Sequence, residues 1–191
     1  MKKTINALAD RRAVAIPTAE GIFTAHYSET GLAELNFPET SQRRRRGAEP
    51  LISPKSVMTD KDSLRRHPPL QIKMRAWHRL TEAALKNVLA GKAPKKFPPL
   101  DLSAGTEFQQ SVWRELHRIS PGKTKSYGEI AGLIRKPKAV RAVGGACGAN
   151  PIPVLIPCHR VLAANGKLGG FSGGLDWKRK LLALEGQTGW A

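Results

Sequence analysis

A thiol, an imidazole and a guanidinium stand side by side in the sequence at Cys158, His159 and Arg160. They follow Pro157 and the apolar stretch 152–156, which is typical of a short buried segment. The thiolate, and not the thiol, is the nucleophilic form of cysteine, and nearby positive charge favours it. The same cysteine also fits a structural role, because free cysteine is among the most buried residue types. These four residues alone leave both interpretations open.

The net charge of the chain indicates what kind of partner it binds. Lysine and arginine together number 32 against 15 acidic residues, which gives a formal net charge of +17. Such a surplus predicts a polyanionic partner, most often nucleic acid, since a generic solubilising surface mixes the two signs more evenly. The basic residues are dense in the segment 121–150, where Glu129 is the only acid. This segment is therefore expected to face phosphates.

Cysteine usage and the N-terminus exclude other classes. Cys147 and Cys158 are the only cysteines, so neither a disulfide framework nor a CxxC zinc pair is present. We expect no metal and no cofactor. The basic start of the chain is followed closely by Asp10 and by no long apolar run, which argues against a secretion signal and a membrane span. The expected location is the cytoplasm, or the nucleus in a eukaryotic cell.

The pattern of residues predicts an α+β fold with two domains. Apolar alternation and turn residues indicate strands at 13–16, 21–27 and 33–37, and helical spacing indicates a helix across 74–88. We expect a small N-terminal α/β domain over 1–98 and a mainly helical domain over 99–191. A basic segment, about 39–69, interrupts the first domain and predicts a mobile loop. It could track DNA or be a solvated insertion.

Helix signals are clear in the second half of the chain. Capping boxes at 106–109 and 126–129 predict two helix starts. Pro137 suits the first turn of a further helix from 138 to about 148, and the two short helices form a helix-turn-helix candidate. Asp176 is expected to cap the last helix.

The candidate second helix of this pair is unusual, because Arg141 is the one long side chain among alanine, valine and glycine. Small residues allow close approach of the backbone, which favours shape-driven contact in the minor groove. The alternative is a helix buried against its neighbours, with Arg141 in a surface ion pair.

Several motifs together resemble one known family. The segment 157–161, preceded by 150–153 and followed by the glycine-rich 169–174, resembles the O6-alkylguanine-DNA alkyltransferases (methylated-DNA–protein-cysteine methyltransferases). The segments 141–144 and 181–186 belong to the same pattern. The resemblance covers roughly residues 106–186, with the motifs in the family's order and spacing. The N-terminal part resembles the family only in general layout.

The resemblance implies a chemistry for the reactive residues. An alkyl group, methyl foremost, would pass irreversibly from O6 of a flipped-out guanine to Cys158, once per molecule. His159 would deprotonate the thiol through a water, because neighbours in an extended segment point to opposite faces. Glu185 would orient the imidazole, and Asn150 would brace the turn that carries the cysteine. Activity on larger alkyl groups and on O4-alkylthymine stays open.

The resemblance also implies which residues hold the substrate. Tyr127 would turn the phosphate aside and protonate guanine at N3, and Arg141 would fill the gap in the base stack. The base would contact the Val161 carbonyl, the Phe171 amide and Ser172. The residues expected to lie against DNA are Lys138, Ala139, Arg141, Ala142 and Gly144. The implied partner is double-stranded DNA with O6-alkylguanine, bound by a monomer; whether neighbouring molecules bind cooperatively stays open.

Four positions differ from the family's commonest residues. Phe171 replaces a tyrosine, Cys147 an asparagine, Ala149 a basic residue and Leu184 a histidine. A non-catalytic alkyltransferase-like module, which binds alkylated DNA and recruits repair factors, is the main alternative. Those relatives lack the cysteine that this chain has. A thiol hydrolase would leave the charge of +17 unexplained.

Overall fold

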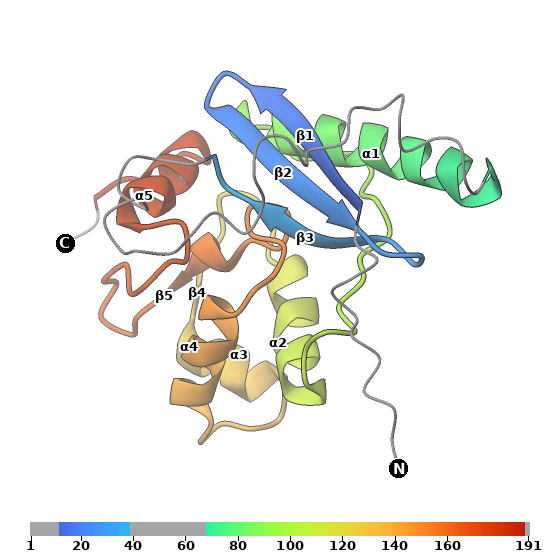
Figure 1. Cartoon of the computed structure of the whole chain (residues 1–191). Coiled ribbons are helices and arrows are strands. Elements are labelled where there is room, and N and C mark those ends of the chain that lie inside the picture. Colours follow the sequence, from blue (N-terminus) through green and yellow to red (C-terminus); the bar gives the residue numbers. More distant parts are fainter. Residues whose placement is uncertain (1–11, 39–67, 190–191) are drawn as a thin grey trace, which may run out of the picture. The chain divides into compact units, whose positions relative to one another are not determined.

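The structure is a computed structural model that describes residues 12–38 and 68–189. The described strands are β1 (Arg12–Thr18), β2 (Gly21–Tyr27), β3 (Leu32–Asn36), β4 (Lys125–Ser126) and β5 (Val161–Leu162) (Figure 1). The described helices are α1 (Pro68–Leu89), α2 (Glu107–His117), α3 (Tyr127–Leu133), α4 (Val140–Gly148) and α5 (Leu175–Leu184), with a 3-10 turn η4 at Cys158–Arg160. This mixture of a small antiparallel sheet and helices confirms the predicted α+β class.

Two compact units make up the chain. The first comprises Met1–Glu82 and Phe97–Ala104, and the second Ala83–Lys96 and Gly105–Ala191. The chain therefore passes between the units inside α1 and returns to the first before α2. No helix in the two described ranges combines the length and apolar character needed to cross a membrane.

The sheet of the first unit has the order β1-β2-β3, with both pairs antiparallel. Alternate side chains are buried, as the sequence pattern predicts, and include Phe23 and Leu35. The predicted turn between β2 and β3 is confirmed, because the Ser28 amide donates to the Gly31 carbonyl at 2.9 Å.

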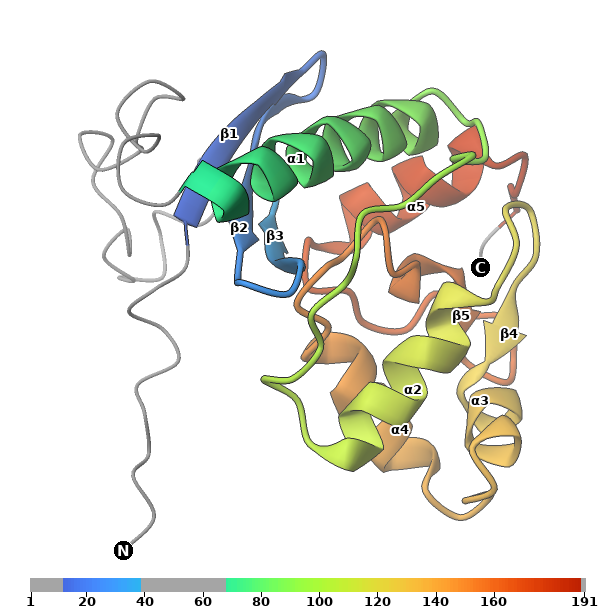
Figure 2. The ribbon, with the colours of Figure 1, turned by 90° about the vertical axis from the view of Figure 1, so that its right-hand side faces the viewer.

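Helix α1 confirms the helical spacing of 74–88, but it begins at Pro68. The predicted basic loop therefore ends before residue 68, and the rest of it, 39–67, lies outside the described residues. Proline suits a first helical turn because the amide it lacks would have no partner there. The part of α1 in the first unit runs along the sheet (Figure 2), and the Tyr27 hydroxyl lies 3.2 Å from His78 Nδ1.

Both predicted capping boxes are present in the second unit. Thr106 Oγ1 accepts from the Gln109 amide at 3.3 Å, and the Gln109 side chain accepts from the Thr106 amide at 2.9 Å. Ser126 and Glu129 repeat this reciprocal pair at 3.1 and 2.6 Å. Each box satisfies amides that the first turn of a helix leaves without partners.

Helix α4 begins at Val140, two residues later than predicted. Arg135 takes a positive φ of 58° after α3, and the Ala139 amide bonds the Lys136 carbonyl at 2.8 Å. Lys138 and Ala139 therefore lie in a turn before the helix.

The prediction that Asp176 caps α5 is wrong. Gly174 stands at the cap position with a φ of 89°, which glycine adopts without steric cost. Asp176 lies in the first turn, where it pairs with Arg179 at 3.3 Å. A negative side chain still stabilises this end of the helix dipole.

A two-residue parallel pairing joins distant parts of the second unit. Lys125 pairs with Val161 and Ser126 with Leu162. Strand β4 leads directly into Tyr127 at the start of α3, and β5 directly follows η4. The pairing therefore links the turn that carries Cys158 to the helix that begins at Tyr127.

Candidate active site

Cys158 opens the 3-10 turn η4 and is only 3% exposed. The approach to it is a tight turn, in which the Ile156 amide bonds the Ile152 carbonyl at 2.9 Å. Val154 within this turn has a φ of 73° and is buried. A β-branched residue is strained in the left-handed region, so the surrounding packing must hold the turn. The cysteine is thus set on a rigid, buried support.

The side chain of Asn150 ties the cysteine to that turn. Its Nδ2 donates to the Ile156 carbonyl at 2.8 Å and to the Cys158 sulfur at 3.1 Å. Its Oδ1 accepts from the Ile152 amide at 3.0 Å. Asn150 is buried, so these bonds satisfy polar groups that water does not reach. This geometry fits the bracing role implied by the resemblance.

The resting sulfur of Cys158 is a neutral thiol. Burial raises the pKa of Cys158 to about 11, although the hydrogen bond from Asn150 and the charge of Lys178 both act to lower it. Burial also raises the pKa of Cys147 to about 12. A reaction at either sulfur therefore requires a base to take the proton.

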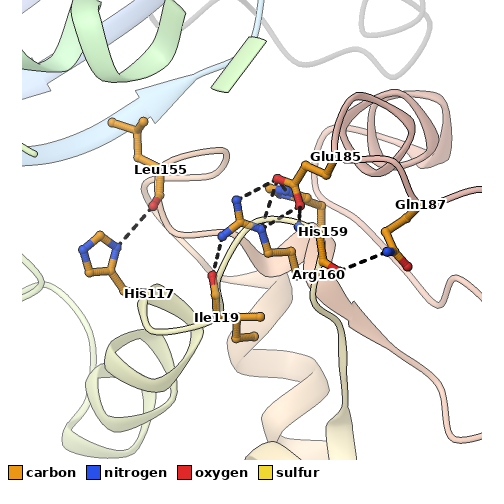
Figure 3. Close-up of polar contacts among 8 residues, drawn as sticks. His117, Ile119, Leu155, His159, Arg160, Glu185 and Gln187 are labelled. Carbon is orange, nitrogen blue, oxygen red and sulfur yellow. Dashed lines mark hydrogen bonds and ion pairs between the residues drawn. The ribbon is translucent and has the colours of Figure 1, made fainter. Parts of the chain in front are cut away.

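His159, the residue after Cys158, forms a buried pair with Glu185 (Figure 3). His159 Nε2 lies 3.1 Å from Glu185 Oε1. Burial alone would raise the pKa of Glu185, but hydrogen bonds from His159 and Arg160 lower it to about 2. The carboxylate is therefore ionised and only accepts, so Nε2 carries the proton and the lone pair lies on Nδ1.

The other ring nitrogen, His159 Nδ1, is buried without a hydrogen-bond partner among the described residues. Burial lowers the pKa of His159, while Glu185 acts to raise it. A neutral imidazole with a free lone pair can act as a general base.

The expectation of an extended segment at Cys158 and His159 is wrong. The two residues belong to a 3-10 turn, closed by the Arg160 amide on the Pro157 carbonyl at 3.0 Å. The directions of the Cys158 and His159 side chains therefore follow the three-residue repeat of a 3-10 turn and not the two-residue alternation of a strand. The bend follows from Pro157, which fixes the backbone at the turn's entry.

Two buried cations belong to the site, and the sequence pointed to one of them, Arg160, only as a positive charge near the thiol. Arg160 binds both oxygens of Glu185, with contacts of 3.1, 3.0 and 2.7 Å, and its Nη1 donates to the Ile119 carbonyl (Figure 3). Lys178 is fully buried and donates to the carbonyls of Val161 (2.7 Å), Leu168 and Gly170. Arg160 was visible in the tetrapeptide, but Lys178 sits in a charged stretch that reads as a solvated helix face.

The Val161 carbonyl, expected to accept from guanine, thus already accepts from Lys178 Nζ at 2.7 Å. A carbonyl oxygen has two lone pairs, so a second donor can still bind.

The glycine-rich loop 169–174 borders the same site. The Phe171 ring lies edge-on to His159, with 6.3 Å between centroids. A Cβ added at Gly169, which has a φ of 64°, would lie 2.7 Å from the Tyr127 hydroxyl. Only glycine therefore lets the phenol pack here. Ser172 lies exposed at the rim of the loop.

Tyr127 brings a proton donor to this loop. Burial and the proximity of Cys147 and Cys158 raise the pKa of Tyr127. The phenol therefore keeps its proton at neutral pH.

Helix α4 has one buried and one exposed face. Val143, Ala146 and Cys147 are buried, while Arg141 and Ala142 are exposed. The alternative prediction, that this helix is buried against its neighbours, thus holds for one face of α4 only. Of the other residues predicted to lie against DNA, Lys138 is exposed, and Ala139 and Gly144 are half-buried; Gly144 approaches the Tyr127 ring. Across the two described ranges, no three histidine, cysteine or acidic side chains group as metal ligands.

Acid should weaken the site through Glu185. Folding lowers the pKa of Glu185 from 4.5 to about 2, so its stabilising effect is complete above about pH 4.5 and is lost as pH falls toward 2. The lowered pKa of His159 acts in the same direction below about pH 6.5, because the unfolded chain binds that proton first. We expect the free energy of unfolding in urea to fall more steeply with acid in the wild type than in Glu185→Gln. Parallel curves would contradict this.

The residues of this site lie within a known domain. A profile of the family described as "6-O-methylguanine DNA methyltransferase, DNA binding domain" matches residues 107–187. A methylated-DNA–protein-cysteine methyltransferase of Mycolicibacterium paratuberculosis is 60% identical over 86 residues, which are 45% of this chain and 52% of that protein. The inducible enzyme of Bacillus subtilis is 52% identical over 97 residues, 51% of this chain and 54% of that protein. The chain thus spans about half the length of the curated relatives it matches.

The similarity extends further in a solved structure. The structure of Mycobacterium tuberculosis OGT in complex with DNA is 36% identical, covers 91% of this chain and 91% of that one, and gives a TM-score of 0.63. The sequence motifs, the domain match and this likeness over nearly both whole chains agree. The chain belongs to the O6-alkylguanine-DNA alkyltransferase (methylated-DNA–protein-cysteine methyltransferase) family.

Proposed function

We propose that the protein repairs DNA by transferring an alkyl group from O6 of guanine to the sulfur of Cys158, irreversibly and once per molecule. One observation carries the proposal: the buried sulfur accepts from Asn150 at 3.1 Å, and the adjacent His159 is a neutral base held by Glu185 at 3.1 Å. A thiol, a base and a group that orients the base are the components of an activated nucleophile.

The proposed reaction keeps its atoms and charges in balance. The thiol proton passes through a bridging water to His159 Nδ1, and the sulfur attacks the alkyl carbon. The carbon–oxygen bond breaks and its electrons pass into the guanine ring, which takes a proton at N3 from Tyr127. The imidazolium proton then returns to the phenolate through solvent. The products are a neutral guanine and a thioether, which no group of the site can cleave.

The target base must leave the duplex to reach this buried sulfur. Arg141, which is exposed on α4, would fill the gap in the stack, and small neighbours such as Ala142 would allow the helix backbone close approach. Gly144 lies on the same helix beside the Tyr127 ring. One helix thereby connects the DNA-facing surface to the proton donor of the site.

The direct test uses a duplex oligonucleotide with a single O6-methylguanine. Mass spectrometry of the intact protein should show one added methyl group, peptide mapping should place it on Cys158, and the DNA should regain guanine. Methylation of Cys147 would show that Cys158 is not the acceptor. Lesion binding without modification would instead support the non-catalytic module. A parallel duplex with O4-methylthymine measures whether that base is also a substrate.

Arg141→Ala should slow transfer from duplex DNA more than transfer from a single-stranded oligonucleotide. The arginine would compensate for unstacking, which costs a few kcal/mol in a duplex and little in a single strand. We expect a loss of about 1–3 kcal/mol of transition-state stabilisation with the duplex, measured as single-turnover rates. Arg114→Ala, an exposed arginine on α2, is the matched control. Equal losses on both substrates would rule out this role.

A further inference from the structure

Arg160 is buried and binds the same carboxylate as the imidazole. Its Nε lies 3.1 and 3.0 Å from the two oxygens of Glu185, and its Nη2 lies 2.7 Å from Oε1. His159 Nε2 meets Oε1 at 3.1 Å. Two neighbouring residues of one 3-10 turn thus share a single buried anion (Figure 3).

Arg160, Glu185 and His159 form a buried trio, and the charge of Arg160 affects whether His159 is protonated. A guanidinium stays protonated in proteins, so Arg160 and Glu185 already balance each other. A further proton on His159 would leave the buried trio with a net positive charge, which burial disfavours. Without Arg160, the carboxylate would have only the imidazole to neutralise it.

We propose that Arg160 is a positioning residue for His159: by binding both oxygens of Glu185, it keeps the imidazole neutral with its lone pair on Nδ1. This inference rests on the proposed role of His159 as the base, and it assigns to the family's adjacent arginine the control of that base's protonation.

The other groups around His159 act consistently with this assignment. Glu185, at the end of α5, favours the protonated ring, whereas Lys178 on the same helix and Arg160 on η4 disfavour it. Phe171 presents an uncharged ring edge-on. Burial of the ring also disfavours the protonated form. Removing Arg160 therefore leaves Glu185 opposed by burial and Lys178 only, and the balance moves toward imidazolium.

Arg160 also has a packing role that any test must separate. Its Nη1 donates to the Ile119 carbonyl, and the Gly122 amide donates to Glu185 Oε2 at 3.2 Å. Gln187 Nε2 bonds the Gly122 carbonyl at 3.0 Å (Figure 3). Arg160 and Glu185 thus hold the loop 119–122. A loss of activity alone would therefore not distinguish an effect on the charge of His159 from a loss of support for this loop.

The decisive measurement is the protonation state of His159 in the full chain. It is monitored across pH by two-dimensional NMR of the histidine ring nitrogens. The wild type should show the proton on Nε2 and no imidazolium near neutral pH. Arg160→Gln should titrate at higher pH than the wild type, and Arg160→Lys should lie between the two because it keeps the charge but not the two-pronged contact. Arg179→Gln, an exposed arginine on α5, should match the wild type. An unchanged titration in Arg160→Gln would overturn the proposal.

A second pair of variants covers the case in which Arg160→Gln does not fold. In Glu185→Gln the arginine remains as an unpaired charge, and adding Arg160→Gln removes it. The double variant should therefore titrate at higher pH than the single one, and equal titrations would also overturn the proposal.

Transfer kinetics add an independent measurement. The acid limb of the single-turnover rate should move to higher pH in Arg160→Gln, so that activity lost at neutral pH is regained in alkali. A uniform loss at all pH values would indicate loop support alone and contradict the proposal. If the wild type transfers no alkyl group, the proposed function fails, whereas the NMR titration still decides the role of Arg160.

Discussion

Cys158→Ala is expected to abolish alkyl transfer completely while leaving affinity for alkylated duplex DNA nearly unchanged. The Cys158 sulfur is the proposed acceptor, and Cys147, the other cysteine, is a poor substitute because burial raises its pKa to about 12. The residues proposed to face DNA lie on α4 and the preceding turn, away from η4 in sequence. The measurement is methyl incorporation by mass spectrometry, combined with binding to a lesion-containing duplex.

Stability should change little in this variant. Asn150 Nδ2 loses the sulfur as an acceptor but keeps the Ile156 carbonyl at 2.8 Å. Replacing one buried thiol by a methyl group costs about 1 kcal/mol. Cys147→Ala is the matched control, with a comparable change in volume and full transfer expected. Transfer that persists without Cys158 would overturn the assignment of the acceptor.

Asn150→Ala should cost both stability and activity. It leaves the buried Ile152 amide without its side-chain acceptor, and an unsatisfied buried group costs about 1–3 kcal/mol. The Ile156 carbonyl loses Asn150 but still accepts from the Cys158 amide at 2.8 Å. The strained turn at Val154 would then be held less firmly. Displacing a nucleophile by about 1 Å can cost on the order of 100-fold in rate. Urea unfolding and single-turnover transfer measure the two effects.

Asn150→Asp separates bracing from electrostatics. The aspartate keeps an oxygen for the Ile152 amide but removes the donor to the Cys158 sulfur, and its negative charge would raise the pKa of the thiol further. Transfer should then require higher pH than in Asn150→Ala. The bracing role would be untenable if both variants kept the rate and stability of the wild type.

Local signals in the sequence predicted much of the fold correctly. The two capping boxes, the Ser28–Gly31 turn and the strand alternation depend on residues a few positions apart, so the chain specifies them without reference to distant segments. The predicted start of α4 and the predicted cap of α5 were each two residues from the observed positions. A turn over 136–139 precedes α4, and Gly174 takes a positive φ at the cap of α5; residue type alone does not reveal where the backbone turns.

The sequence by itself determined which residues are candidates for the proposed reaction, because the segment 157–161 and its flanking motifs occur in the order and spacing of the family they resemble. Only the tertiary structure decided their electrostatics. Glu185 lies 25 residues from Arg160 and 26 from His159, and folding closes these distances to hydrogen bonds that leave the imidazole neutral. Lys178 had no predicted role, yet folding buries it among three carbonyls. Charges in a protein interior depend on which groups are brought together and shielded from water, and that information is absent from residue spacing.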